Sequence, residues 1–269
     1  MEYIKLAITF LFFALLYLPV VGPLIKEWIS VEDYSHGFLI PLISLYFLWH
    51  KREDLRKTAV SPSFTGLVFM LSGVTLYLLA RAGYQFFLQC FSALIVLFGI
   101  IYASAGKEMA RKMAFSIGYL IFMIPLPQLV YNNLTFHLRL LSTKLAYLVL
   151  MLLGSNATRE GNIINLSTCS LVIANPCSGL RGLIVMIAAS LAVGYLFQND
   201  IRKRAILFAS SFIIAIIVNT ARLVVTAITV DIIEAFSVPA VVHDVTGFIA
   251  MGIGLVALFW LNDILRKTR

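Results

Sequence analysis

NPCSGLRGL, residues 175–183, is a polar, glycine-punctuated turn that leads directly into a long apolar helix. Proline is favoured in the first turn of a helix, and the free N–H groups there carry partial positive charge. A cysteine at this place, here Cys177, has a stabilised thiolate and is suited to act as a nucleophile. Free cysteine is also among the residue types most often buried as a small hydrophobe, so this stretch alone leaves a packing role open.

The composition around this turn is that of an integral membrane protein. Of the 269 residues, 61% are hydrophobic and 13% are charged, and the mean hydropathy is +0.94, well outside the averages for soluble domains. The net charge of +8 does not indicate nucleic-acid binding, because the basic residues stand in short clusters between apolar runs, where they act as topology signals. The first apolar run lacks a small-residue cleavage site, and we interpret it as a retained membrane helix.

Eight apolar runs predict an all-α membrane protein with about eight transmembrane helices. The runs at residues 37–49 and 113–126 are short for a bilayer of about 30 Å and need tilt or flanking residues to cross it. No internal repeat, flexible linker or loop large enough for a soluble domain is visible, so residues 1–269 are predicted to form a single integral membrane domain. The eight runs are about 5–24, 37–49, 64–80, 86–104, 113–126, 178–197, 205–230 and 241–262.

Clusters of Lys and Arg predict the orientation of these spans. With eight spans, the clusters at residues 51–57, 107–112, 202–204 and 266–269 all fall on one side of the membrane. The positive-inside rule makes that side cytoplasmic, so both termini are inside. Cys177 is then at the extracytoplasmic face.

The longest outer segment, residues 127–177, contains two predicted elements. Leucines at steps of four and three form one face of a helix, whereas polar residues occupy the other face. We expect an extracytoplasmic amphipathic helix lying in the membrane interface, with a ninth span over residues 129–153 as the alternative. The alternating, β-branched run at 162–173 predicts a short β-hairpin before Cys177. The leucines are at 134, 138, 141, 145, 148 and 152.

Polar residues in the last two spans accompany Cys177. Arg222 lies inside an apolar run with Asn219 one turn earlier, and a charge within a span costs at least about 2.5 kcal/mol and by default indicates function. An ion pair or a lipid-phosphate contact is the alternative. His243 and Asp244 open the last span at the same depth, where a histidine can also simply lie among the lipid headgroups.

Cysteine, histidine and arginine together suit acyl transfer. The thiolate attacks a carbonyl carbon, the imidazole carries the proton, and the guanidinium or backbone N–H groups stabilise the oxyanion. A disulfide between Cys169 and Cys177 would remove this nucleophile. The sequence contains no H-E-x-x-H, C-x-x-C, P-loop or G-x-S-x-G pattern, so no metal ion and no cofactor are expected.

Five short motifs resemble those of one family, in the family's order. They are DYSHGFLIP at 33–41, IPLP at 124–127, CSGLR at 177–181, NTAR at 219–222 and HDVTG at 243–247. The set is similar to the exosortase/archaeosortase membrane cysteine transpeptidases, and more closely to the bacterial exosortases. The resemblance extends over nearly the whole chain.

The resemblance implies a membrane-embedded cysteine peptidase and transpeptidase that recognises C-terminal sorting signals. Such a signal consists of a short Pro-Glu-Pro motif, a transmembrane helix and a basic tail. The enzyme would cleave membrane-anchored substrate proteins through a Cys177 thioester and transfer them to a lipid or polysaccharide acceptor, for surface or exopolysaccharide-linked export. Its expected place is the cytoplasmic (inner) membrane of a bacterium, as a multi-pass protein with the active site at the extracytoplasmic face.

The resemblance also implies roles for individual residues. Cys177 is the nucleophile, Arg222 the oxyanion or thiolate partner, and His243 the proton carrier. The expected supporting residues are Ser178, Gly179, Asn219 and Asp244.

Two other functions compete with this interpretation. A transporter or flippase for a lipid-linked or exopolysaccharide precursor would use Arg222 to bind a phosphate in the membrane and would have no need of Cys177. Replacing Cys177 by serine would therefore leave a transporter working and abolish a transpeptidase. A purely structural membrane scaffold is the second alternative. It would not explain why Cys177, Arg222 and His243 occur at the same depth of the membrane.

Overall fold

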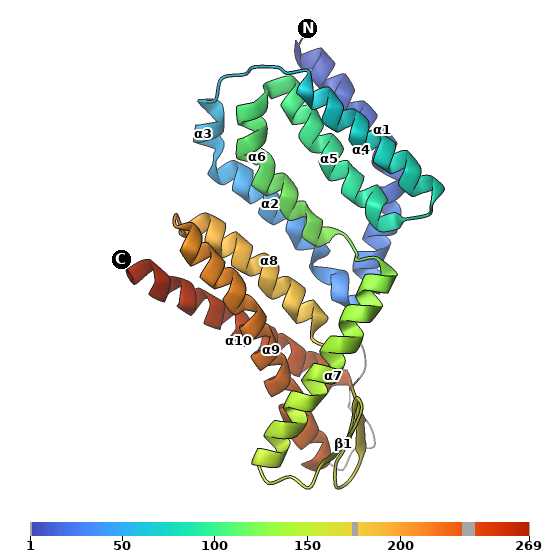
Figure 1. Ribbon diagram of the computed structural model, residues 1–269, viewed down its shortest axis with the longest axis vertical. Coiled ribbons are helices and arrows are strands. Elements are labelled where there is room, and N and C mark those ends of the chain that lie inside the picture. Colours follow the sequence, from blue (N-terminus) through green and yellow to red (C-terminus); the bar gives the residue numbers. More distant parts are fainter. Residues whose placement is uncertain (1, 174–176, 233–239, 269) are drawn as a thin grey trace. The chain divides into compact units, whose positions relative to one another are not determined.

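The structure is a computed structural model in which residues 2–173, 177–232 and 240–268 are described, with the side chains of residues 2–6 and 240–244 excepted. The chain divides into two compact units, Met1–Pro127 and Gln128–Arg269 (Figure 1). Both units are built of helices, as the apolar runs predict. The fold is that of an all-α membrane protein with one small sheet.

The first unit contains six α-helices and two short 3₁₀ helices within its described residues. The α4–α5 hairpin packs closely because glycines stand where the two backbones meet. A Cβ atom added at Gly66 would lie 2.1 Å from the backbone nitrogen of Ala103, and one at Gly99 would lie 2.6 Å from that of Met70. Small residues allow such approach between membrane helices. The elements are α1 (Glu2–Ser30), η1 (Glu32–Phe38), α2 (Leu39–His50), α3 (Arg52–Arg56), α4 (Thr65–Ala82), α5 (Phe86–Ala105), α6 (Lys107–Tyr119) and η2 (Leu120–Met123).

Contacts at the two ends of α2 tie the first unit together. At its C-terminal end, Lys112 Nζ donates to Asp54 Oδ1 at 2.7 Å, which brings the basic clusters at 51–57 and 107–112 to the same end of the unit. At its N-terminal end, Trp28 Nε1 donates to the Met123 carbonyl at 2.8 Å. His36 Nε2 lies 3.1 Å from the Phe122 carbonyl oxygen, to which it donates. The motif at 33–41 is thus held through His36 against η2, which directly precedes the motif at 124–127.

Among the residues that the structure describes, the second unit combines four helices with a three-stranded antiparallel sheet in the order β1-β2-β3. Strands β2 and β3 form the predicted hairpin, with Ile164 opposite Leu171, and β1 adds a third strand. Ile164, Leu150 of α7 and Leu223 of α9 share one buried apolar cluster, against which Cys177 packs. The elements are α7 (Gln128–Leu152), β1 (Thr158–Glu160), β2 (Ile163–Asn165), β3 (Ser170–Val172), α8 (Leu180–Phe197), α9 (Ile201–Ile232) and α10 (Ala240–Lys267).

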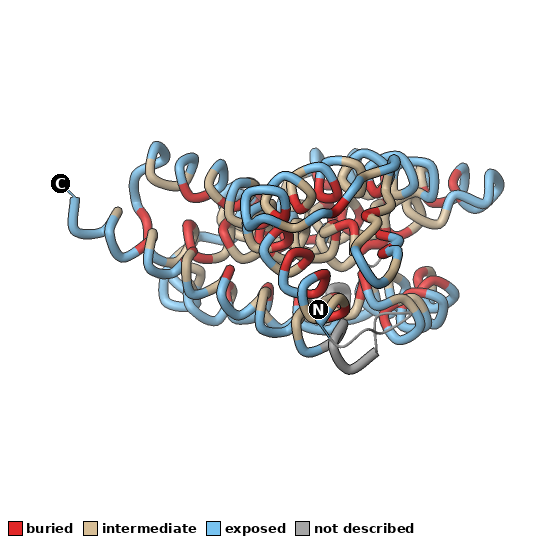
Figure 2. The backbone as a smooth tube through the Cα atoms, turned by 90° about the horizontal axis from the view of Figure 1, so that it is seen from below, coloured by how far each residue is buried: buried red, intermediate tan, exposed pale blue. Residues whose placement is uncertain are grey.

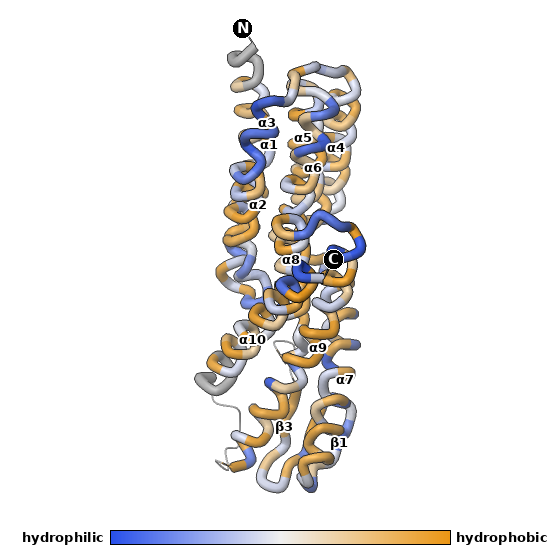
Figure 3. Tube along the Cα trace, turned by 90° about the vertical axis from the view of Figure 1, so that its left-hand side faces the viewer, coloured by the Kyte–Doolittle hydropathy of each residue, from blue (hydrophilic) through white to orange (hydrophobic). Residues whose placement is uncertain are grey.

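The helices bury narrow stripes and leave wide apolar faces exposed. Buried positions recur along each helix with exposed positions between them (Figure 2). Much of the exposed surface is apolar, while hydrophilic residues gather at connections such as α3 (Figure 3). Leu71, Leu129 and Phe248 are examples of exposed large apolar side chains. Such faces are stable in contact with lipid, which agrees with a membrane protein of several spans.

Seven helices among the described residues are long and apolar enough to cross a membrane: α1, α4, α5, α7, α8, α9 and α10. The predicted spans at 37–49 and 113–126 do not qualify. Helix α2 has 12 residues and α6 has 13, so each covers only about 20 Å of a 30 Å core. The first two residues of the run at 37–49 belong to η1. In the run at 113–126, the α-helix ends at Tyr119 and η2 follows; Pro125 then disfavours helix in the residue before it. Helix α7 is long enough to be a span, and its interfacial placement stays a prediction.

Basic residues gather at one end of the second unit, and Cys177 lies at the other end of α8. Lys203 Nζ donates to the Leu265 carbonyl at 2.7 Å, and Gln198 Nε2 donates to Asn262 Oδ1 at 2.8 Å. These bonds join the α8–α9 turn to the C-terminal end of α10. Within this unit, the basic residues at 202–204 and at 266–267 are therefore on the same side, as the charge pattern predicts. Which compartment that side faces stays a prediction.

Candidate active site

The candidate nucleophile precedes the first turn of α8. Asn175 and Pro176 lie outside the described residues, and helix α8 begins three residues after Cys177. Gly179 has φ +86° and ψ 2°, a left-handed conformation that glycine adopts at no steric cost. The Leu180 N–H donates to Ser178 Oγ at 3.3 Å and the Leu183 N–H to the Gly179 carbonyl at 2.9 Å. These bonds fix the turn to the helix.

Arg222 contacts the sulfur of Cys177. Its Nη2 donates to Cys177 Sγ at 3.6 Å. Arginine keeps its charge when partly buried and presents a planar fork of donors, so it can stabilise a thiolate or a negative oxygen that develops beside it. All three cysteines are free thiols, so the disulfide with Cys169 that would have removed the nucleophile is not formed. Cys177 and Arg222 are thus in contact, and their catalytic roles stay a prediction.

Asn219 holds the Cys177 turn from the same face of α9, one turn before Arg222. Its Nδ2 donates to Ser142 Oγ at 3.0 Å and to the Cys177 carbonyl at 3.5 Å. The amide lies so close to Gly179 that an added Cβ would be 2.7 Å from Nδ2. Of the expected supporting residues, Asn219 therefore lies directly against Gly179 and the Cys177 carbonyl.

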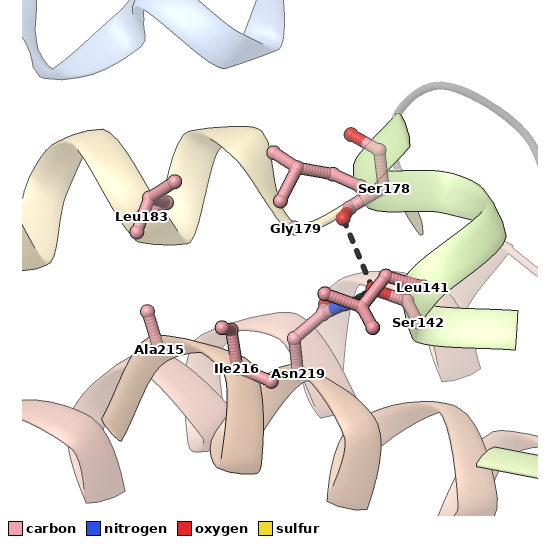
Figure 4. Close-up of a pocket in the computed structure, with 9 residues that line it drawn as sticks. Leu141, Ser142, Ser178, Gly179, Leu183, Ala215, Ile216 and Asn219 are labelled. Carbon is pink, nitrogen blue, oxygen red and sulfur yellow. Dashed lines mark hydrogen bonds between the residues drawn. The ribbon is translucent and has the colours of Figure 1, made fainter. Parts of the chain in front are cut away.

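Ser142 is a member of this cluster that the sequence did not reveal. It comes from α7, and its Oγ donates to the Ser178 carbonyl at 3.3 Å while it accepts from Asn219 (Figure 4). Both Ser142 and Ser178 are buried. One serine among the polar residues of an amphipathic helix carries no recognisable signal. The available hint was that a polar helix face next to the cysteine segment needs buried partners.

Helix α10 passes next to the Arg222 side chain. A Cβ added at Gly247 would lie 3.9 Å from Arg222 Cζ, and Thr246 Oγ1 lies 3.5 Å from Thr226 Oγ1. The side chains of His243 and Asp244 lie outside the described residues. His243 is one turn before Gly247, so the two positions share a helix face. The predicted convergence of histidine on the site is untested.

A small pocket opens beside the turn, between α7, α8 and α9. Its volume is about 250 Å³ including the space at its mouth. Ser142, Ser178, Gly179 and Asn219 form its polar end (Figure 4). In the part of the chain that the structure describes, no three His, Cys, Asp or Glu side chains come together to hold a metal ion. The apolar walls are Leu138, Leu141, Leu183, Ala215 and Ile216.

A family model described as transmembrane exosortase matches residues 28–260. The chain belongs to the transmembrane exosortases. No match was found among curated proteins or among solved structures. Exosortases are membrane-embedded cysteine transpeptidases that act on sorting signals, and the family match favours this class over a transporter.

In this exosortase the matched range includes all five motifs. Two of them, at 177–181 and 219–222, meet through the contact of Cys177 with Arg222. A thiol next to a fixed guanidinium has the chemistry of an activated nucleophile. The arrangement suits attack of the sulfur on a carbonyl carbon. The positive charge of Arg222 lies next to the sulfur, where the thiolate carries its negative charge.

Proposed function

We propose that this exosortase cleaves C-terminal sorting signals through a thioester on Cys177 and transfers the released protein to an acceptor. The observation that carries the proposal is the 3.6 Å contact between Arg222 Nη2 and Cys177 Sγ, in a chain of the exosortase family. The substrate is a membrane-anchored protein whose signal has a short Pro-Glu-Pro motif, a transmembrane helix and a basic tail.

The first half of the reaction forms the thioester. The Cys177 thiol gives its proton to His243, and the thiolate attacks the carbonyl carbon of the scissile peptide bond. Arg222 stabilises the oxyanion of the tetrahedral intermediate. The C–N bond breaks, the leaving nitrogen takes the proton from His243, and the acyl group stays on the sulfur.

The second half releases the product. A hydroxyl or amine of a lipid or polysaccharide acceptor attacks the thioester and gives its proton to His243. The C–S bond breaks, and Cys177 is regenerated by recovery of that proton. If water attacks instead, the same steps give hydrolysis.

We place this chemistry at the extracytoplasmic face of the inner membrane of a bacterium. The support is the separation, within the second unit, between Cys177 at one end of α8 and the basic turn at 202–204 at the other. Basic clusters stay preferentially in the cytoplasm. With the three native cysteines replaced, an impermeant thiol reagent should therefore label a cysteine placed at the exposed Val172 of β3, five residues before Cys177, from outside and fail to label one placed at 203.

Cleavage of a tagged sorting-signal substrate in membranes tests the function. Cys177→Ala should leave the substrate uncut, because no other group replaces the thiolate. Cys169→Ala is the matched control. Cys169 is also a partly buried free thiol, and its backbone carbonyl accepts from the Leu166 N–H, a bond that alanine keeps. Cleavage should persist in that control. Equal cleavage by Cys177→Ala and the wild type would contradict the proposal.

A further inference from the structure

Ser142 forms a two-way bridge between α7 and the Cys177 turn. Its Oγ accepts from Asn219 Nδ2 at 3.0 Å and donates to the Ser178 carbonyl at 3.3 Å. A hydroxyl has one donor and two acceptor sites, so both bonds form at the same time. The side chains of Ser142, Ser178 and Asn219 are buried. A buried polar group that loses its hydrogen-bond partner destabilises the folded protein.

The bridge fixes two successive peptide groups of the turn. Ser142 holds the Ser178 carbonyl, and Asn219, which Ser142 orients, donates to the Cys177 carbonyl at 3.5 Å. The described residues contain no cis peptide bond, and a peptide group is planar. Fixing each carbonyl therefore also fixes the direction of the N–H on the same group, and with it the backbone from which the Cys177 side chain projects.

A neighbouring residue shows what a purely structural hydroxyl looks like on this helix. Thr143 is fully buried, and its Oγ1 donates to the Arg139 carbonyl at 2.7 Å within α7 itself. That bond lies inside one helix. The Ser142 bonds instead join α7 to α9 and to the segment before α8.

We propose that Ser142 is a positioning residue of the active site, which orients Asn219 and the Ser178 carbonyl and thereby presents the Cys177 sulfur to Arg222. The proposal rests on the proposed function for its catalytic consequence. It extends the site to α7, a helix for which the sequence predicted an interfacial or membrane-spanning placement but no role in the site.

Two readouts test this role in the full-length protein. The first is cleavage of the tagged substrate, with kcat and KM determined separately. The second is the rate at which iodoacetamide alkylates Cys177 as a function of pH, measured by mass spectrometry on the peptide that contains Cys177. Alkylation reports the placement of the thiol whether or not the protein cuts sorting signals.

Ser142→Ala should lower kcat roughly 10- to 100-fold, the size expected for two lost buried hydrogen bonds, with a smaller change in KM. The pH profile of Cys177 alkylation should shift as well. Thr143→Val removes a buried hydroxyl of the same helix and should change neither readout. The double variant Ser142→Ala with Asn219→Ala should lose less activity than the product of the two single losses, because the bond between Asn219 and Ser142 is already absent from each single variant.

The possible outcomes separate the two proposals. Equal behaviour of Ser142→Ala and Thr143→Val in both readouts would overturn the positioning role. If Cys177→Ala still cleaved substrate while Ser142→Ala shifted the alkylation profile, the proposed function would fail and the positioning of Cys177 would stand. If Ser142→Ala does not accumulate, Ser142→Cys keeps a donor and an acceptor at this position, both of them weaker, and should show both effects in reduced size.

Discussion

Replacing Gly179 by alanine should disable the site while the helices of the second unit still form. Gly179 has φ +86°, and a side chain in the left-handed region costs about 1–2 kcal/mol. The added Cβ would also lie 2.7 Å from Asn219 Nδ2 and 2.8 Å from its Cγ, so the amide must move away. Loss of the bond from Asn219 to Ser142 adds about 0.5–1.5 kcal/mol.

The two effects together amount to about 1.5–3.5 kcal/mol. If this energy displaces the Cys177 turn, cleavage should fall by about 10- to 300-fold, at 1.4 kcal/mol for each factor of ten. The assay is cleavage of the tagged substrate in membranes, with the amount of each variant matched by immunoblot. Alkylation of Cys177 provides a second measure that needs no substrate.

Gly182→Ala is the matched control. A Cβ at Gly182 meets no atom within 4 Å, and alanine is favoured over glycine in a helix by up to about 1 kcal/mol. This variant should cleave like the wild type and be at least as stable. Wild-type cleavage and alkylation by Gly179→Ala would refute the reasoning that the turn is held against Asn219.

Three further changes have expected outcomes. Arg222→Lys should insert normally and lose a factor of about 10² to 10³ in turnover, because an ammonium lacks the fixed fork of donors. The hydrogen bond from Lys112 lowers the pKa of Asp54; this contact should stabilise the protein above about pH 4 and lose its effect as the pH falls through the lowered pKa. Asp54→Asn should accordingly reduce the fall in melting temperature between pH 6 and pH 3. Gly37→Ala should lower the melting temperature, because its Cβ would overlap the Trp28 ring.

Each of these changes has a control and a contradicting result. If Arg222→Lys turned over substrate at nearly the wild-type rate at matched expression, any positive charge would suffice at this position, and the argument from the guanidinium donors would be contradicted. Glu108→Gln removes an exposed pair with Arg111 at 3.3 Å and should leave the acid response unchanged; an acid response in Asp54→Asn equal to that of the wild type would count against the Asp54 argument. Gly118→Ala is the control for Gly37→Ala, because a Cβ at Gly118 meets no atom within 4 Å. If the melting temperature of Gly118→Ala were no higher than that of Gly37→Ala, the packing argument would be contradicted.

Residues that are chemically out of place in a membrane could be found from the sequence. Arg222 and Asn219 stand out in an apolar run, and Cys177 stands in a polar turn before another. The structure brings all three together. Ser142 could not be found in this way, because its role depends on how α7 packs against α8 and α9, and a single serine does not report that packing.

The limits of the fold prediction have physical causes. Composition locates apolar runs, but it does not show that residues 32–38 and 120–123 form 3₁₀ helices. The α-helices are therefore Leu39–His50 and Lys107–Tyr119 instead of the predicted 37–49 and 113–126. The β2–β3 hairpin was predicted from alternation. Strand β1, with the sequence TRE, has no such pattern and is defined by its pairing with β2.

The most direct test of the central claim is to trap the acyl group on Cys177. Membranes that contain the wild-type protein are incubated with the tagged sorting-signal substrate, and mass spectrometry is used to look for substrate covalently bound to the Cys177 peptide. The predicted result is an adduct on Cys177 that hydroxylamine releases, as expected of a thioester, and that is absent from Cys177→Ala, in which uncut substrate accumulates. Cleavage by Cys177→Ala at the wild-type rate, with no adduct in either protein, would contradict the account.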